Sequence, residues 1–269
     1  MEDTLQIRVG CRFSGSATER SPTVFQLQPC TGDAHEILEE SWRTEPDVAC
    51  HEYCDSYGNR CQRLTVPPGE FMLRYDALVR TPATLDPADP TAVELAPADL
   101  PDDVLIYTSP SRYCLSDEMA ATAEKLFGTT PPGYGRVEKI NAFVHNHLEY
   151  KMGTSTSLTT ALAAYERGAG VCRDFAHLAV TFCRALDIPA RYTFGYLPDI
   201  DKKSLYPMDF HAWFEAYLGD RWWTFDPRNN DRRRGRIVVG RGCDAVDVAL
   251  ATTYGNATLN ELSVWSDLA

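Results

Sequence analysis

The sequence predicts a mixed α+β fold in which an antiparallel, β-rich first part precedes a second part of helices and strands. The first 80 residues carry short, often alternating apolar segments, such as 5–13 and 71–79, separated by Gly, Pro, Asn and Asp. This pattern is typical of antiparallel strands. After residue 115, helical periodicity comes first, and strand patterns follow beyond Pro189. No internal repeat interrupts this order.

We expect three regions: a β-rich domain over residues 1–80, a connector over 81–110 and an α+β core over 111–269. A hairpin turn is expected at 55–59, where Asp, Gly and Asn cluster. The connector carries five prolines and six acidic residues between Thr81 and Asp103, so it cannot sustain a helical or strand periodicity.

Four helices are expected in the core, over 116–127, 136–148, 158–167 and from Cys172 onward, because apolar residues recur there at helical spacing. Strands are expected over 190–197, 210–218, 221–227 and 236–240, where β-favouring residues dominate.

Composition narrows the classes of function. The chain has 269 residues, 38 acidic against 26 basic side chains, a net charge of -12 and a pI near 4.9. It lacks the basic field that nucleic acid or an anionic membrane requires. The sequence shows no signal peptide and no run long enough to span a bilayer, so we expect a cytoplasmic protein. In a reducing compartment its nine cysteines are free thiols by default.

Cys172 differs from the other cysteines in its setting. It follows the turn Gly168-Ala-Gly-Val at the expected start of a long helix. Unpaired N–H groups and the positive end of the helix dipole would favour its thiolate, which is a nucleophile. The two glycines allow a sharp turn and leave room for a substrate, and the backbone N–H of Cys172 is a plausible oxyanion donor. The alternative is a buried cysteine that only packs.

A hairpin supplies a partner for this thiol. Residues 209–227 form two β-favouring runs separated by Gly219-Asp220, which fits a type II′ turn. In that register Glu215 pairs with Thr224, and His211 and Asp226 become diagonal neighbours on one face, roughly 7 Å or less apart between Cβ atoms. The alternative is a surface His–Asp pair.

Cys172, His211 and Asp226 together supply a nucleophile, a base that later acts as an acid, and a carboxylate that holds the imidazole tautomer. His177 lies five residues after the cysteine and therefore points about 140° away around the helix. A structural hydrogen bond is the favoured role for His177.

These motifs resemble the transglutaminase-like superfamily, and within it the bacterial cysteine-protease type. The matching stretches are GAGVCRDFAHL, DFHAWFEAYL and GDRWWTFDPRNN, with further likeness in DSYGNR, SPSRYCLSDE and GRIVVGRGCDAVDV. The resemblance implies that Cys172, His211 and Asp226 are the family's triad. It also implies an N-terminal β-sandwich-like region followed by a papain-like, transglutaminase-like α+β core. Two positions depart from the pattern: Arg173 replaces a frequent glutamine, and Arg228 replaces a usual threonine.

The function expected from the residues is cysteine-dependent hydrolysis of peptide or amide bonds in a peptide or protein substrate, through an acyl-enzyme. Tyr196 and Trp213 are candidate substrate contacts, because their strands should border the site. Two alternatives stay open: acyl transfer to an amine, as in transglutaminases, and a non-catalytic binding module on the same fold. A cleft filled by the chain's own side chains would favour the module.

No cofactor or metal is expected. The group Cys50, His51, Cys54 and Cys61 could be imagined as a zinc site, but its spacing matches no common pair and cross-strand packing explains it. His145 and His147 lie two apart on an expected helix and point to different faces. No phosphate loop, dinucleotide fingerprint or calcium loop is found.

Overall fold

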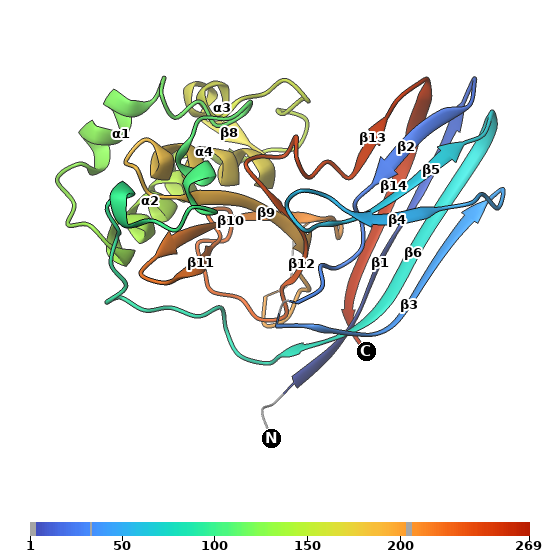
Figure 1. Cartoon of the computed structure of the whole chain (residues 1–269), viewed down its shortest axis with the longest axis horizontal. Helices are drawn as coiled ribbons and strands as arrows, with labels where there is room; N and C mark the ends of the chain where they lie inside the picture. The colour runs from blue at the N-terminus through green and yellow to red at the C-terminus, as the bar shows by residue number, and fades with distance from the viewer. Residues whose placement is uncertain (1–3, 33, 203–205) are drawn as a thin grey trace.

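The computed structural model describes residues 4–32, 34–202 and 206–269. Its first part is a sandwich of two antiparallel sheets, seen on the right of Figure 1. One sheet has the strand order β14-β1-β6-β3 and the other β13-β2-β5-β4. The strands are β1 (Thr4–Ala17), β2 (Ser21–Phe25), β3 (Glu36–Glu45), β4 (His51–Cys54), β5 (Arg60–Val66), β6 (Gly69–Pro82), β13 (Ala251–Thr253) and β14 (Ala257–Leu268).

The alternation of apolar and polar residues explains the long strands of the sandwich. In β1, Ile7, Val9 and Phe13 are buried, whereas Arg8 and Arg12 are exposed. Since successive side chains of a strand point to opposite faces, one face of β1 enters the core and the other meets solvent. The expected turn at 55–59 connects β4 and β5, which pair in antiparallel fashion. The β-rich prediction for the first part is confirmed.

The last strands belong to the sandwich and not to the core. β13 pairs with β2, and β14 pairs with β1 along most of its length. The structure therefore differs from the expected core range of 111–269, because residues 251–268 return to the first part. Figure 1 shows this return, with the red β14 lying beside the blue β1.

The connector is tied to the core by hydrogen bonds, although only two short 3-10 helices form in it, η1 (Pro97–Asp99) and η2 (Leu105–Thr108). The N–H of Gly219 donates to the carbonyl of Val93 at 2.7 Å. Asp86 accepts from the backbone N–H of Arg233 at 2.9 Å. These bonds hold Asp86 and Val93 of the 81–110 segment against the core.

The second part packs helices on an antiparallel sheet of order β11-β10-β9-β12. Its elements are α1 (Ala120–Phe127), α2 (Tyr134–His147), α3 (Ala161–Arg167), α4 (Cys172–Arg184), β9 (Ala190–Tyr196), β10 (His211–Leu218), β11 (Arg221–Phe225) and β12 (Ile237–Gly242). Two short parallel strands, β7 (Glu149–Tyr150) and β8 (Ala169–Gly170), precede α4. Each expected helix exists, but α1 starts at Ala120 and not at residue 116, because residues 117–119 form turns.

One hydrophobic core joins the two parts. Phe194, Tyr196 and Ile237 of the core sheet pack in the same buried cluster as Ile7 and Leu73 of the sandwich. The other face of the core sheet packs against α4 through a second cluster. The strand β9 therefore has protein on both faces, which explains why almost all of its side chains are buried.

Candidate active site

Cys172 is the first residue of α4, and the local sequence fixes it there. Gly168 ends α3 with a φ of 70°. Asp174 accepts a hydrogen bond from the N–H of Val171 at 2.8 Å and is almost fully buried. A Cβ on Gly170 would lie 2.6 Å from the Cβ of Asp174, so glycine is required at that position. The N–H of Cys172 has no acceptor within the helix, because it belongs to the first turn.

The hairpin forms as predicted where its strands pair. Glu215 lies opposite Thr224 and Leu218 opposite Arg221, and Gly219 has a φ of 65°. The ladder ends at the pair of Phe214 and Phe225, so His211 and Asp226 lie beyond the paired residues of the two strands. The expected diagonal contact does form: Nε2 of His211 donates to Oδ2 of Asp226 at 2.8 Å, and both side chains are buried.

Cys172 meets this pair from the start of α4. Its Sγ lies 3.9 Å from the carbonyl oxygen of Phe210, the residue before His211. Burial by itself lowers the pKa of His211, but the charge and hydrogen bond of Asp226, together with a hydrogen bond to Cys172, raise it above the ordinary value. The structure thus brings the three residues together in the order that the sequence predicts. Because Nε2 is bonded to Asp226, Nδ1 is the nitrogen left for the thiol.

Asp226 is held ionised by groups that the sequence did not point to. Burial raises its pKa, but His211, the guanidinium of Arg236 and Asn229 outweigh burial and hold it well below the usual range. Nη2 of Arg236 donates to Oδ2 of Asp226 at 2.9 Å, while Nε donates to Asp86 at 2.8 Å. Asn229 adds its backbone N–H and its side-chain amide. A buried chain Asp86–Arg236–Asp226 therefore underlies the imidazole.

Arg228 lies against the other nitrogen of the imidazole. Its Nη1 is 3.3 Å from Nδ1 of His211, and its guanidinium carbon lies 4.0 Å from the ring centre of Tyr150. Strand β7 places Tyr150 there by pairing it with Gly170. Nδ1 of His145 donates to the carbonyls of Pro227 and Arg228 at 3.1 Å, which fixes the turn after Asp226.

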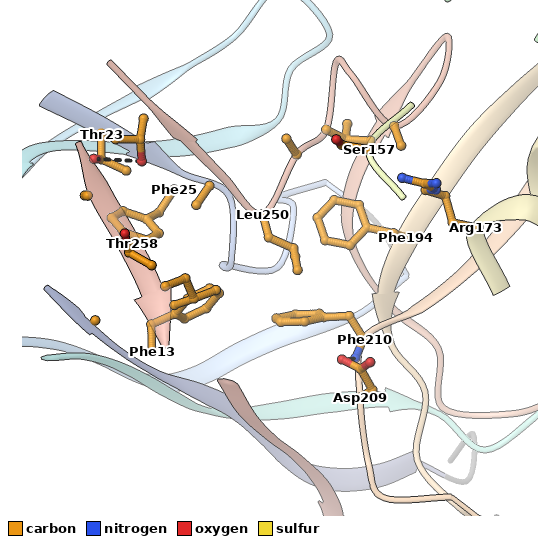
Figure 2. A pocket seen from close by; sticks show the side chains of 18 of the residues that line it. Phe13, Thr23, Phe25, Ser157, Arg173, Phe194, Asp209, Phe210, Leu250 and Thr258 are labelled. Carbon is orange, nitrogen blue, oxygen red and sulfur yellow. Dashed lines mark hydrogen bonds between the residues drawn. The ribbon is translucent and has the colours of Figure 1, made fainter. Parts of the chain in front are cut away.

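Two pockets share Asp209, Phe210 and His211 among their lining residues. The first, about 550 Å³, includes Cys172 and Arg173 and extends toward the sandwich. The second, about 580 Å³, includes Tyr150, Tyr206 and Arg228. Figure 2 shows the first pocket, with Asp209 and Phe210 on the core side of it. The thiol therefore has open space beside it.

Arg173 is held at the rim of the first pocket. Its Nη2 donates to Oγ of Ser155 and to the carbonyl of Thr156, both at 2.6 Å. Its guanidinium carbon lies 5.3 Å from the ring centre of Tyr113. This cation braces the loop before α3.

Two expected substrate contacts are structural residues, which corrects the prediction. Tyr196 is fully buried and donates its hydroxyl to the carbonyl of Leu27 at 2.9 Å, so it ties β9 to the sandwich. Trp213 is 1% exposed and packs under the guanidinium of Arg236. Neither side chain lines either of the two pockets. The sequence predicts that their strands lie near the site, but it does not show that other parts of the chain cover their side chains.

His177 has the structural role that its helix position predicted. It is fully buried, its Nε2 accepts from the N–H of Ala245 at 3.1 Å, and its ring stacks on that of Tyr113. Burial lowers its pKa to about 3, despite the opposing charge of Asp244. A permanently neutral imidazole at this position holds the segment after β12 against α4.

The described residues contain no group of three or more His, Cys, Asp or Glu arranged to hold a metal ion. Cys50, His51 and Cys54 are exposed, whereas Cys61 is buried. Within the part of the chain that the structure describes, no helix is both long and apolar enough to cross a bilayer.

Comparisons with known proteins bear on the family and the fold of this chain. A family model described as the transglutaminase-like superfamily matches residues 120–227. A crystal structure from Cytophaga hutchinsonii, provisionally described as that of a cysteine protease, is 32% identical, has a TM-score of 0.90, and is matched over 99% of this chain and 91% of its own. The chain belongs to the transglutaminase-like superfamily. This transglutaminase-like chain therefore has the fold of a family of cysteine-dependent hydrolases and transferases.

Two mycobacterial proteins are also similar to this transglutaminase-like chain. An uncharacterized protein of Mycobacterium leprae is 29% identical over 252 residues, which span 89% of this chain and 88% of that protein. An uncharacterized protein of Mycobacterium tuberculosis is 34% identical over 115 residues, which span 39% of this chain and 37% of that protein. The predicted fold class, a β-sandwich-like region before a transglutaminase-like α+β core, is confirmed.

Proposed function

We propose that this protein is a cysteine-dependent hydrolase of peptide or amide bonds that works through an acyl-enzyme on Cys172. One observation carries the proposal: Cys172 begins α4 beside His211, whose Nε2 lies 2.8 Å from the buried carboxylate of Asp226. A thiol, a base and an orienting carboxylate are the parts that nucleophilic acyl transfer needs.

The proposed reaction starts with attack of Sγ of Cys172 on the carbonyl carbon, while the thiol proton passes to Nδ1 of His211. The oxyanion that forms accepts a hydrogen bond from the N–H of Cys172 at the start of α4. When the carbon–nitrogen bond breaks, the leaving amine takes the proton from Nδ1. Water then attacks the thioester, gives one proton to Nδ1 and releases the acid, and the proton returns to the thiolate.

The electrostatics support these roles. The raised pKa of His211 lets it hold a proton near neutral pH, which an acid for the leaving amine must do. Asp226 stays ionised, because its pKa is held well below the usual range, and so stabilises the imidazolium. The open space of about 550 Å³ beside Cys172 supports an enzyme over a binding module with a filled cleft.

Alkylation by iodoacetamide at pH 7, followed residue by residue with mass spectrometry, tests the activated thiol. Cys50 and Cys54 are exposed and serve as references within the same molecule. We expect Cys172 to react at least about tenfold faster than both, and His211→Ala to remove that advantage. If Cys172 reacts no faster than the references in the folded protein, the catalytic proposal fails.

Quenching the reaction of a p-nitroanilide substrate with acid tests for the acyl-enzyme intermediate. We expect intact mass to show an acyl group on Cys172 in the wild type and none in Cys172→Ala. Adding methylamine separates hydrolysis from transfer: an amide product in place of the acid would favour the transferase.

We also propose a cytoplasmic location, which the nine free cysteines support, and cell fractionation tests it.

A further inference from the structure

The pocket beside Cys172 is apolar and runs away from the nucleophile into the sandwich. Its lining includes five phenylalanines and a leucine: Phe13, Phe25, Phe71, Phe194, Phe210 and Leu250. Figure 2 shows the rings of Phe194 and Phe210 toward the core, those of Phe13 and Phe25 toward the strands of the sandwich, and Leu250 between them. The sandwich therefore supplies one wall of the catalytic pocket.

Polar groups occur mainly at the two ends of this pocket. Asp209, Arg173 and Ser157 lie at the core end, and Thr23 and Thr258 at the sandwich end, as Figure 2 shows. The hydroxyl of Thr23 already donates to the carbonyl of Ser21. Between these two ends, Figure 2 shows Phe194, Phe210 and Leu250, whose side chains offer no hydrogen bond.

We propose that the acyl group transferred to Cys172 is a medium or long aliphatic chain, so that the substrate class is N-acyl amides. The proposal rests on the proposed acyl-enzyme. A peptide entering the same pocket would bring backbone N–H and C=O groups into its apolar middle, at roughly 1–3 kcal/mol for each group left without a partner. An alkyl chain brings none.

The size of the pocket supports the same occupant. A volume of about 550 Å³ lies within the range of roughly 300–1,000 Å³ that buries a drug-sized ligand. A single amino-acid side chain would leave much of it empty. An extended chain attached to Sγ of Cys172 can pass Phe210 and Leu250 and reach the phenylalanines of the sandwich. The leaving amine then lies on the other side of His211, in the second pocket.

Two measurements with one series of compounds test the proposal. The compounds are 7-amino-4-methylcoumarin amides carrying acetyl, hexanoyl and decanoyl groups, with a tripeptide coumarin amide for comparison. Binding to Cys172→Ala is measured by fluorescence titration, and kcat/KM is measured on the wild type. We expect affinity and kcat/KM to rise by up to about fourfold per added methylene until the pocket is full.

A larger side chain inside the pocket should shorten the acyl chain that binds best. In Leu250→Trp we expect decanoyl binding to fall at least about tenfold, and to fall more than acetyl binding does. Leu268→Trp is the matched control, because Leu268 is 57% exposed on β14 and does not line the pocket. Thermal unfolding of each variant shows whether it is folded, and the wild-type chain-length series does not depend on either variant.

The outcomes separate this proposal from the proposed function. If affinity for Cys172→Ala differs by less than twofold from acetyl to decanoyl, the acyl pocket is refuted, whatever the activity. If binding follows chain length but the wild type forms no product, the pocket stands and the hydrolase fails. If the tripeptide amide is turned over better than the decanoyl amide, the hydrolase stands and the aliphatic substrate class fails.

Discussion

Replacing Arg236 by methionine tests the charge network beneath the imidazole. The guanidinium is 7% exposed and bridges two carboxylates, Asp226 at 2.9 Å and Asp86 at 2.8 Å. Methionine keeps an unbranched apolar side chain beside Trp213 but removes the cation. Both carboxylates then stay in buried positions without it, with side-chain exposures of 1% for Asp226 and 11% for Asp86.

The expected cost follows from that burial. Removing one partner of a buried ion pair destabilises a protein by about 3–5 kcal/mol, because the remaining charge is uncompensated. In a domain of this size each kcal/mol lowers Tm by about 2–4 °C, so we expect Tm to fall by about 6–20 °C at pH 7. Urea unfolding with an unchanged m value gives the free energy itself.

The pH dependence has a defined sign. The folded-state pKa of Asp226 is lowered, so its contribution to stability is present above the ordinary value of about 3.9 and is lost as pH falls through the folded value. Without Arg236, Asp226 is protonated at a higher pH, which relieves the uncompensated charge. The stability gap between wild type and Arg236→Met should therefore narrow from pH 7 toward pH 4.

Arg80→Met is the matched control. Arg80 pairs with Glu36 on the surface, where the two side chains are 41% and 64% exposed. Such a pair contributes about 0–1 kcal/mol. The double variant Asp86→Asn/Arg236→Met should recover part of the loss, because one buried charge is removed as well. If Arg236→Met costs no more than Arg80→Met, the network does not hold Asp226 and this reasoning is refuted.

Three further predictions concern the same site. Gly170→Ala should cost about 1–3 kcal/mol in urea unfolding, because the new Cβ would lie 2.6 Å from the Cβ of Asp174; an unchanged stability would contradict the required close approach. Asp226→Asn should lower kcat by about 10²–10⁴-fold. It should also lower the pKa of His211 in an NMR titration, since the charge that raises this pKa is gone; an unaltered titration would exclude the ion pair of His211 and Asp226. Arg228→Gln should raise the pKa of His211, because a cation and a donor to Nδ1 are removed together; a lower pKa would show that Arg228 does not contact the imidazole in solution.

The geometry of the hairpin could be predicted from the sequence because it is local. A two-residue turn at Gly219 sets the register of both strands, and that register brings His211 to Asp226. Cys172 could be predicted for a similar reason, because the glycines before it mark the start of α4. Arg236 lies just before β12 and Asp86 lies in the connector, and neither has a local signal for its partner.

The remaining differences between prediction and structure come from contacts between residues that are far apart in the sequence. Tyr196 and Trp213 lie on the expected strands, but only the three-dimensional packing shows that their side chains are covered. β14 was not predicted because most of its residues are exposed at the edge of a sheet, so its apolar alternation is weak. Its pairing with β1 is set by a partner about 250 positions away in the sequence.

The shared core argues that the sandwich is part of one folded unit with the core and not an attached module. It supplies Phe13, Phe25 and Phe71 to the wall of the pocket beside Cys172, and the connector supplies Asp86 to the charge network. A chain cut at residue 111 would lose both, and it would expose the face of β9 that Tyr196 ties to the sandwich. Transfer of that apolar face to water opposes folding of the isolated core. The pocket beside Cys172 and the charge network around Asp226 therefore depend on residues outside the core.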